Sequence, residues 1–421
     1  MFNHFQEVES FFVERKSLGI KPGLDRVKEL LRLLGNPQDM LKAIHIAGTN
    51  GKGSTLSFLK NALQANGYHV GVFTSPSFFG LTGYMFKDDQ AIPEDVFVEI
   101  CNRIYPFIIQ LDNRDMAPTE FEIITAVAFV YFTRQTDIVL VEAGMGGRED
   151  TTNCFQPILS IITNVDRDHT AFLGHRLEDI AYHKAGVIKQ GSPVIIGDMD
   201  EAALEVINEE VRLKRTKSYQ LGNEFIYKEF KNGHSFLFTH ADDQIEADVS
   251  MYGEHQVKNA SIALMTLLLL KQVGYKLDME RSCVGLRRTQ VPGRFEVVRE
   301  QPMIILDGAH NPAGVQAFLN TVSQSFANQE KHLIFAAFKD KDLKTMQGQL
   351  QRQFSSIIFT SFDHPRAAQV ADLKAAGGKK NNEYQPDWHH VIEYILTQKS
   401  GNYFITGSLH FITEVRKYLN V

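Results

Sequence analysis

The sequence is poor in cysteine and tryptophan, with three cysteines and one tryptophan in 421 residues. Cys101, Cys154 and Cys283 share no short metal-binding spacing and cannot all pair with one another. This argues against a disulfide framework and against a cysteine-based metal motif. A reducing cytosol is therefore the expected setting.

The chain also lacks an excess of positive charge, since its formal net charge is -6. Sequence-independent nucleic-acid binding needs a basic footprint, so no nucleic-acid partner is expected. The segment from Met1 to Glu7 lacks the basic-then-apolar layout of a signal peptide. The richest apolar stretch, Leu264 to Leu270, is cut short by Lys271 and is too short to span a membrane. We expect a cytoplasmic protein with no membrane partner.

Average hydrophobic and charged fractions, 43% and 22%, indicate a soluble protein with a large core, and the length suits two or three domains. Short apolar, β-branched runs alternate with segments of helical period, which predicts a doubly wound α/β domain. A hairpin pattern around Asn232-Gly233 predicts a small antiparallel β patch on this domain. The expected strands of the doubly wound part are Lys42 to Ala47, Val70 to Thr74, Asp137 to Ala143 and Ser160 to Val165.

A second α/β alternation follows Arg294 and predicts a smaller Rossmann-like domain. Its apolar runs are Met303 to Leu306, Leu333 to Ala337, Ile357 to Thr360 and Tyr403 to Thr406. We place the domains at residues 1–295 and 296–421. The polar segment from Gly377 to Asn382 is expected to be a solvated loop.

The loop Gly48-Thr49-Asn50-Gly51-Lys52-Gly53-Ser54 stands between a predicted strand and a predicted helix. Such a loop turns backbone N–H groups and a helix N-terminus toward phosphate oxygens. Lys52 would reach the β- and γ-phosphates of a nucleotide, and the hydroxyl of Ser54 would bind Mg²⁺. The spacing departs from the general Walker pattern, because Ala47 stands five residues before the lysine where that pattern has glycine. A plain glycine turn is the alternative interpretation.

Polar residues follow two other predicted strands. Glu142 ends one of them, at the carboxyl edge where doubly wound sheets bind ligands, and a carboxylate there suits a nucleotide-bound Mg²⁺. His169 follows another strand, but histidine is an unusual Mg²⁺ ligand, so by itself it is typical of a hydrogen-bonded loop residue. Lys184 by itself is typical of a surface helix lysine.

Eleven motifs follow one another along the chain. They are HIAGTNGKGS (His45 to Ser54), FTSP (Phe73 to Pro76), PTEFE (Pro118 to Glu122), VEAGMGGREDTTN (Val141 to Asn153), NVDRDH (Asn164 to His169), HKAGVIK (His183 to Lys189), GEHQVKNA (Gly253 to Ala260), PGRFE (Pro292 to Glu296), LDGAHNP (Leu306 to Pro312), DKD (Asp340 to Asp342) and HPRA (His364 to Ala367). In this order they resemble the folylpolyglutamate synthase/dihydrofolate synthase family of the Mur ligase superfamily. The resemblance implies that the short glycine loop is this family's own form, which accounts for the Walker mismatch.

The resemblance implies the residues that carry the site. Lys52, Lys184 and His310 are implied to be catalytic, with Lys184 carbamylated so that a cation becomes a carboxylate-like ligand. The implied metal ligands are Ser54, Ser75, Glu142, His169 and Lys184. The implied ATP contacts are Gly48, Thr49, Asn50, Gly51, Lys52, Gly53, Ser54, Asn259, Arg294 and Asp307. The implied pterin-side pocket is Thr119, Glu120, Phe121 and Glu122.

The implied reaction is the ATP- and Mg²⁺-dependent addition of L-glutamate to a folate or to dihydropteroate, with about two metal ions. Phosphoryl transfer turns the unreactive carboxylate into an acyl phosphate, which the amine of glutamate then attacks. The acyl phosphate must be kept from water, which predicts a cleft closed by two domains and a monomeric enzyme.

The segment Ser77 to Phe86 departs from the family, which usually has a histidine after Ser-Pro and then Glu-Arg-Ile. The choice between folate and dihydropteroate therefore stays open. A Mur-type ligase acting on another carboxylate is the alternative, and the pterin-side match at Pro118 to Glu122 argues against it. A third hypothesis, a P-loop kinase or a nucleotide-binding regulator, does not explain the motifs LDGAHNP and HPRA in the second domain.

Overall fold

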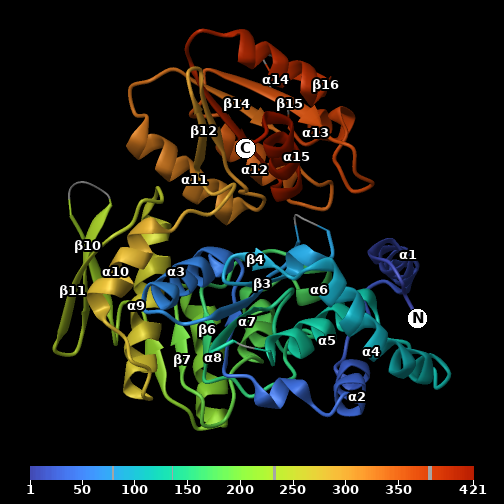
Figure 1. Ribbon diagram of the computed structural model, residues 1–421. Helices are drawn as coiled ribbons and strands as arrows, with labels where there is room; N and C mark the ends of the chain where they lie inside the picture. Colours follow the sequence, from blue (N-terminus) through green and yellow to red (C-terminus); the bar gives the residue numbers. More distant parts are fainter. Residues whose placement is uncertain (78–79, 135, 231–233, 378–381) are drawn as a thin grey trace. The chain divides into compact units, whose positions relative to one another are not determined.

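The computed structural model describes residues 1–421 except 78–79, 135, 231–233 and 378–381. The chain divides into two units (Figure 1). Unit 1 consists of residues 1–249 and 257–289, and unit 2 consists of residues 250–256 and 290–421. The boundary at residues 295 and 296 stays a prediction about domains.

The main sheet of unit 1 has eight strands in the order β4-β3-β2-β5-β1-β6-β7-β8. The six strands from β2 to β8 in this order pair in parallel, while β3 and β4 form an antiparallel edge. The central strands are buried on both faces, which explains their continuous apolar runs. The strands are β1 (Ala43–Ala47), β2 (Val70–Phe73), β3 (Met85–Lys87), β4 (Gln90–Ala91), β5 (Ile138–Glu142), β6 (Leu159–Ile162), β7 (Val194–Ile196) and β8 (Ser218–Gln220).

Helices cover this sheet through two hydrophobic clusters. One cluster joins Ala43, Val139 and Val141 of the sheet to the first, second, fourth and fifth helices. The other joins Ala47, Ile162 and Val194 to the seventh and eighth helices. The helices are α1 (Phe5–Arg15), α2 (Asp25–Leu33), α3 (Lys52–Ala65), α4 (Glu94–Asp112), α5 (Glu120–Phe132), α6 (Thr170–Leu173), α7 (Leu177–Ala185), α8 (Glu201–Lys214), α9 (Glu254–Gln272) and α10 (Met279–Arg288), with 3₁₀ turns at Lys16–Leu18, Pro37–Met40 and Thr82–Tyr84.

The expected antiparallel patch is a three-stranded sheet of β9 (Ile226–Glu229), β10 (Ser235–His240) and β11 (Asp243–Asp248). Phe225, Phe236 and Phe238 are buried in it. Figure 1 shows this sheet in yellow-green beside α10. The predicted turn at Asn232-Gly233 lies outside the described residues.

Unit 2 has a six-stranded sheet in the order β12-β13-β17-β14-β15-β16, in which β12 alone is antiparallel to its neighbour. Apolar clusters lie on both faces of the sheet, as in a Rossmann-like domain. Of the predicted loop at Gly377 to Asn382, residues 378–381 lie outside the described part. The elements are β12 (Glu296–Glu300), β13 (Met303–Leu306), α11 (Pro312–Ser325), β14 (Lys331–Phe335), α12 (Leu343–Leu350), β15 (Ser356–Ser361), α13 (Val370–Ala375), β16 (Glu383–Asp387), α14 (Trp388–Thr397), β17 (Asn402–Thr406) and α15 (Leu409–Leu419).

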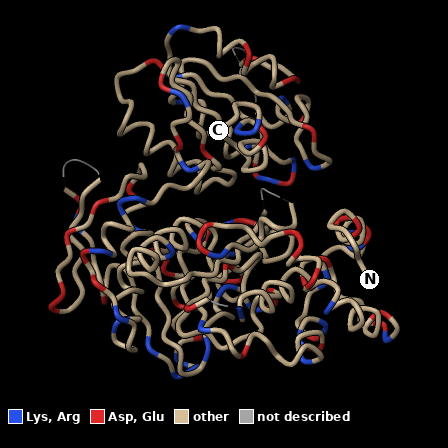
Figure 2. Tube along the Cα trace, viewed as in Figure 1, with Lys and Arg blue, Asp and Glu red and all other residues tan. Residues whose placement is uncertain are grey.

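Charged residues of both signs are interspersed along both units (Figure 2). Among the described residues, no helix has the length and apolarity needed to span a bilayer. The predicted fold class, a P-loop-type doubly wound domain with an antiparallel patch and a smaller Rossmann-like domain, is confirmed.

Candidate active site

The loop between β1 and α3 can be built only with glycine at two positions. Gly48 has a φ of +151°, and a Cβ there would lie 1.8 Å from Thr163 Oγ1. Gly51 has a φ of +84°, and a Cβ there would lie 2.5 Å from Asn259 Oδ1. Both positions combine a backbone conformation that favours glycine with a neighbour that leaves no room for a side chain. The structure thereby brings Asn259 against the loop, and its role as an ATP contact stays a prediction.

The loop is tied to the segment that follows β6. Asn164 Oδ1 accepts hydrogen bonds from the N–H groups of Thr49 (3.1 Å) and Asn50 (2.8 Å). Thr49 Oγ1 donates to the carbonyl of Asp166 at 3.0 Å and accepts from the Asp166 N–H at 2.9 Å. The N–H groups at the start of α3, which begins at Lys52, are therefore the donors that this geometry leaves for an anion.

Lys52 and Glu142 meet at the carboxyl edge of the sheet. Lys52 Nζ donates to the carbonyl of Gly48 at 3.0 Å and lies 3.9 Å from Glu142 Oε1. Glu142 is buried, and Thr74 Oγ1 donates to its Oε2 at 2.5 Å. The pair combines a cation suited to phosphate with a carboxylate suited to a metal.

Ser75 follows Thr74 directly, and its Oγ is a buried atom that has no hydrogen-bond partner among the described residues. Ser54, in the first turn of α3, is also buried. Two hydroxyls and one carboxylate are hard oxygen donors of the kind that Mg²⁺ prefers. Within the described chain no group of three His, Cys, Asp or Glu side chains is placed to hold a metal. Any metal at this edge would therefore depend on the hydroxyls as well.

Lys184 lies buried near the end of α7. Burial, and then the positive charge of Lys52, lowers the pKa of Lys184 to about 7, while Asp168 and Asp150 act in the opposite direction. The structure thus brings Lys184 within electrostatic reach of the phosphate loop. A surface lysine would keep its charge at neutral pH, whereas this amine is neutral for a large fraction of molecules.

His169 directly precedes α6, in a left-handed conformation with a φ of +50°. Its backbone N–H donates to the carboxylate of the buried Asp168 at 2.8 Å. Asp168 also acts on the pKa of Lys184, so this segment belongs to the same corner of unit 1.

The predicted pterin-side residues lie at the start of α5, where some cap the helix and others pack elsewhere. Thr119 and Glu122 form a capping box, and the fully buried Glu122 lies 3.1 Å from Arg26. The ring of Phe121 packs near Phe73 and Tyr84, with centroids 5.9 and 6.1 Å away. Burial raises the pKa of Glu120. Thr119 and Glu122 therefore hold the start of the helix, whereas Phe121 belongs to an aromatic cluster with Phe73 and Tyr84.

Unit 2 carries a compact group of its own. The carboxylate of Asp307 accepts from the N–H groups of Phe295 and Ala309, each at 2.9 Å. Burial raises the pKa of Asp307, and the charge of Arg294 opposes this rise. The Nδ1–H of His310 donates to the carbonyl of Gly308 at 2.8 Å, so the proton is held on Nδ1. Arg294, Asp307 and His310 are thus brought together within unit 2.

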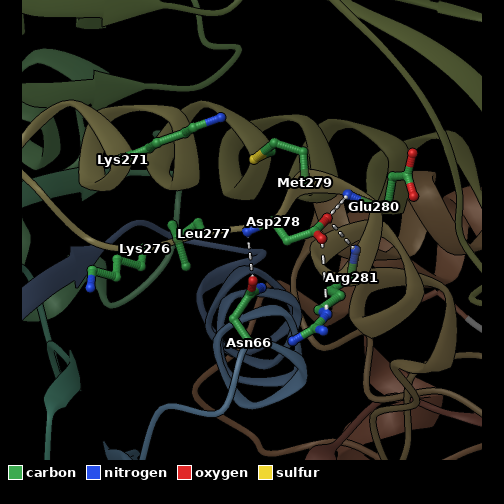
Figure 3. A pocket seen from close by; sticks show the side chains of 8 residues that line it. All are labelled: Asn66, Lys271, Lys276, Leu277, Asp278, Met279, Glu280 and Arg281. Carbon is green, nitrogen blue, oxygen red and sulfur yellow. Dashed lines mark hydrogen bonds and ion pairs between the residues drawn. The ribbon is translucent and has the colours of Figure 1, made fainter.

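A separate cavity of about 730 Å³ opens on another part of unit 1 (Figure 3). Its central carboxylate, Asp278, caps α10 by accepting from the N–H groups of Glu280 and Arg281, at 2.9 and 3.2 Å. None of the predicted site residues lines this cavity, so it does not locate the chemistry. Its lining is Asn66, Lys271, Lys276, Leu277, Asp278, Met279, Glu280 and Arg281.

Sequence reasoning missed Asp150, Thr152, Phe73 and Tyr84 as individual residues around the site. The motif that holds Asp150 and Thr152 was recognised, but only Glu142 was singled out from it. An aspartate close behind a run of glycines was the available signal. The aromatic cluster has no local signal, because its three members come from β2, from the turn before β3 and from α5.

Two segments of the chain match two domains of the Mur ligases. The Mur ligase middle domain matches residues 46–267, and the Mur ligase glutamate ligase domain matches residues 293–408. The phosphate loop, Lys52, Glu142 and Lys184 lie in the first match. Arg294, Asp307 and His310 lie in the second. The fold and the site thus define an ATP-dependent ligase of the Mur type.

Similar proteins narrow this class further. The dihydrofolate synthase/folylpolyglutamate synthase of Bacillus subtilis is 37% identical over 430 residues, covering 100% of both chains. The folylpolyglutamate synthase of Mycobacterium tuberculosis, solved with ADP and AMPPCP, superposes with a TM-score of 0.90 at 27% identity, over 99% of this chain and 98% of that chain. That of Thermotoga maritima gives 0.85 at 32% identity, over 99% and 98%. The chain belongs to the dihydrofolate synthase/folylpolyglutamate synthase family.

The predicted family, enzyme class and binding of ATP are confirmed by these matches. The roles assigned to single residues stay predictions. So do the metal ions, the carbamate on Lys184, the monomeric state and the cytoplasmic location.

Proposed function

We propose that the protein joins the amino group of L-glutamate to the carboxylate of dihydropteroate or of a folate, at the expense of ATP. The observation that carries this proposal is the corner formed by Lys52, Glu142 and Lys184. It combines a phosphate-binding cation, a buried carboxylate and a buried amine that is often neutral. The name of the Bacillus subtilis relative supports both acceptors.

The first step is transfer of the γ-phosphoryl group of ATP to an oxygen of the acceptor carboxylate. Lys52 and the N-terminus of α3 would hold the β- and γ-phosphates and offset the charge that moves between them. The leaving group of the resulting acyl phosphate is phosphate rather than oxide. The amine of glutamate attacks the carbonyl carbon and loses a proton. The C–O bond to the phosphate breaks, and phosphate leaves with the electron pair of that bond.

Mg²⁺ fits the donors at the carboxyl edge of the sheet. Ser54, Ser75 and Glu142 would hold it, and the buried Ser75 Oγ with no partner among the described residues is the observation that supports this. When bound, Mg²⁺ would neutralise charge on the phosphates. His169 and Lys184 would complete the set of ligands, and we expect about two ions, as in other phosphoryl-transfer sites.

Lys184 can act as a metal ligand only after chemical modification, because an ammonium group repels cations. Its neutral amine would attack CO₂, forming an N–C bond and releasing one proton, so that the side chain ends in a carbamate anion. Burial supports this step because it lowers the pKa of Lys184 to about 7 and so supplies the neutral amine. We propose the carbamate as the working form of Lys184.

Within unit 2, Arg294 and Asp307 are proposed to contact ATP, and His310 to act near the reacting phosphate. Their shared support is local: Arg294 precedes β12, whereas Asp307 and His310 follow its antiparallel partner β13, and the charge of Arg294 acts on the pKa of Asp307. We further propose that the protein works as a monomer in the cytoplasm. The three free cysteines are in keeping with a reducing compartment.

The test is phosphate release by the purified protein with ATP, Mg²⁺ and L-glutamate, with dihydropteroate and tetrahydrofolate supplied separately. We expect release that depends on at least one of the two acceptors, together with an acceptor product heavier by one glutamate residue. Release that is independent of both acceptors would reject the proposal. Activity with only one of the two acceptors would show which reaction is compatible with the segment Ser77 to Phe86, whose sequence differs from that usual in the family.

A further inference from the structure

A fully buried histidine stands in the middle of β1, where its neighbours Ile44 and Ile46 are also fully buried. The ring of His45 packs against Phe155, with centroids 5.1 Å apart. His45 Nε2 lies 2.9 Å from Thr152 Oγ1, while Nδ1 has no hydrogen-bond partner in the described part of the chain. A buried polar atom without a partner is unfavourable for stability, so an apolar residue would suit this position better for stability alone.

The direction of the hydrogen bonds follows from the hydroxyl of Thr152. This hydroxyl has one hydrogen, which it donates to Asp150 Oδ1 at 2.5 Å, and it therefore accepts from the Nε2–H of His45. Burial lowers the pKa of His45 to about 3, so the ring is neutral at physiological pH. The chain His45–Thr152–Asp150 thus holds one imidazole tautomer, with the proton on Nε2.

The carboxylate at the end of this chain closes the loop that follows Glu142. Asp150 Oδ2 accepts from the N–H of Met145 at 2.7 Å, and Oδ1 accepts from the N–H of Thr152 at 3.0 Å. Both oxygens are therefore engaged with the backbone of the loop itself. Met145 is three residues beyond Glu142, so Asp150 controls the path of the chain as it leaves β5.

The same loop is bonded to the helix that carries Lys184. The N–H of Arg148 donates to the carbonyl of His183 at 2.6 Å, and Asn153 Nδ2 donates to the carbonyl of Gly186 at 3.0 Å. A Cβ at Gly147 would lie 3.0 Å from the carbonyl oxygen of Lys184. The loop therefore joins Glu142 at one end to the backbone around Lys184 at the other.

We propose that His45, Thr152 and Asp150 are positioning residues, forming a buried relay that holds loop 143–153 in the one shape that aligns Glu142 with Lys184. The relay rests on the proposed function, because its purpose is to place two of the proposed Mg²⁺ ligands. Groups that orient metal ligands from behind usually change metal affinity or activity about 10- to 100-fold when they are removed.

The deciding variant is Thr152→Val, which keeps the volume of the side chain and removes its hydroxyl. We expect its Mg²⁺ affinity, measured by titration calorimetry with ADP bound, to fall about 10-fold or more. The affinity for ADP itself should stay at the wild-type value, because Asn164 and Thr163 hold the phosphate loop independently of the relay. Thr152→Ser, which restores the hydroxyl, should restore the Mg²⁺ affinity.

Thr266→Val is the matched control. Thr266 is fully buried in α9, where its hydroxyl donates to the carbonyl of Ile262 at 2.8 Å. This variant loses one buried hydroxyl just as Thr152→Val does, and it should leave Mg²⁺ affinity unchanged. Equal Mg²⁺ affinities in the two valine variants would overturn the relay.

Nitrogen NMR of the wild-type protein provides a test that needs no variant to fold. His45 should show a protonated Nε2 and an unprotonated Nδ1 that do not titrate through neutral pH, and a proton on Nδ1 would overturn the relay. The wild-type protein could show this tautomer, and the variants the expected Mg²⁺ affinities, while no ligase activity is found. That outcome would reject the proposed function and leave the relay standing.

Discussion

Lys52 Nζ lies 3.9 Å from Glu142 Oε1, so the cation of the phosphate loop and the carboxylate at the end of β5 form an ion pair. The pair follows from the sheet, because β1 and β5 are parallel neighbours with Ile46 opposite Glu142. Both side chains lie at the carboxyl edge of the strands, where α/β sheets bind their ligands. This pair marks the place where we expect phosphoryl transfer.

Replacement of Lys52 by methionine should abolish most of the ligase activity. Loss of one group that stabilises charge in the transition state typically lowers kcat about 10²- to 10³-fold. The measurement is steady-state phosphate release with saturating acceptor and glutamate. Lys60→Met is the control, because Lys60 lies on the same helix and pairs with Asp89 instead. Equal rates in the two variants would remove Lys52 from the chemistry.

Gly51→Ala should weaken nucleotide binding through sterics and backbone strain. A Cβ at this position would lie 2.5 Å from Asn259 Oδ1, and the φ of +84° is unfavourable for alanine. We expect the KM for ATP to rise about 10-fold, equivalent to about 1.4 kcal/mol of lost binding. Gly348→Ala in α12 meets no atom within 4 Å and should behave as wild type. An unchanged KM for ATP in Gly51→Ala would contradict the loop geometry.

Lys184→Ala should be nearly inactive, and short carboxylates such as formate or acetate should restore part of the activity. The added anion would occupy the space of the proposed carbamate and supply a metal-binding oxygen. Lys189→Ala is the control for the position of the lysine, because burial also lowers the pKa of Lys189, to about 8. Lys189 is not one of the predicted metal ligands. Rescue of both variants, or of neither, would argue against a carbamate on Lys184.

His45 should make the folded protein sensitive to acid. Burial lowers its pKa from 6.5 to about 3, so the unfolded chain takes up a proton at a higher pH than the folded protein does. Its contribution to stability is therefore complete above pH 6.5 and is lost as the pH falls toward 3. In urea titrations from pH 7 to 4, His45→Gln should lose stability less steeply than wild type. Parallel curves would contradict the buried, neutral ring.

Much of the fold was accessible to sequence reasoning, because strands buried on both faces leave continuous apolar runs. The runs around β1, β2, β5 and β6 were all predicted, with ends that differ from those of the strands by at most three residues. The antiparallel edge of β3 and β4 was not predicted. Those strands are three and two residues long and partly exposed, so they carry no clear period.

The candidate site was predictable where chemistry follows a strand, as at Lys52 and Glu142. The burial of Lys184 was not, because a helix pattern does not reveal which polar residue faces the core. On strand β1, His45 stands between two isoleucines, and this alternation is equally typical of a polar residue that faces solvent, so the burial of His45 was not predicted either. Phe73, Tyr84 and Phe121 meet only through tertiary packing, so no local pattern could join them.

The central claim is that ATP activates a carboxylate as an acyl phosphate, and oxygen labelling tests it most directly. The acceptor is prepared with both carboxylate oxygens as ¹⁸O and is converted in unlabelled water with ATP, Mg²⁺ and L-glutamate. Mass spectrometry of the released phosphate should find one ¹⁸O per phosphate, with the other ¹⁸O in the new amide. Phosphate without ¹⁸O, formed at the same rate as the amide product, would contradict the account.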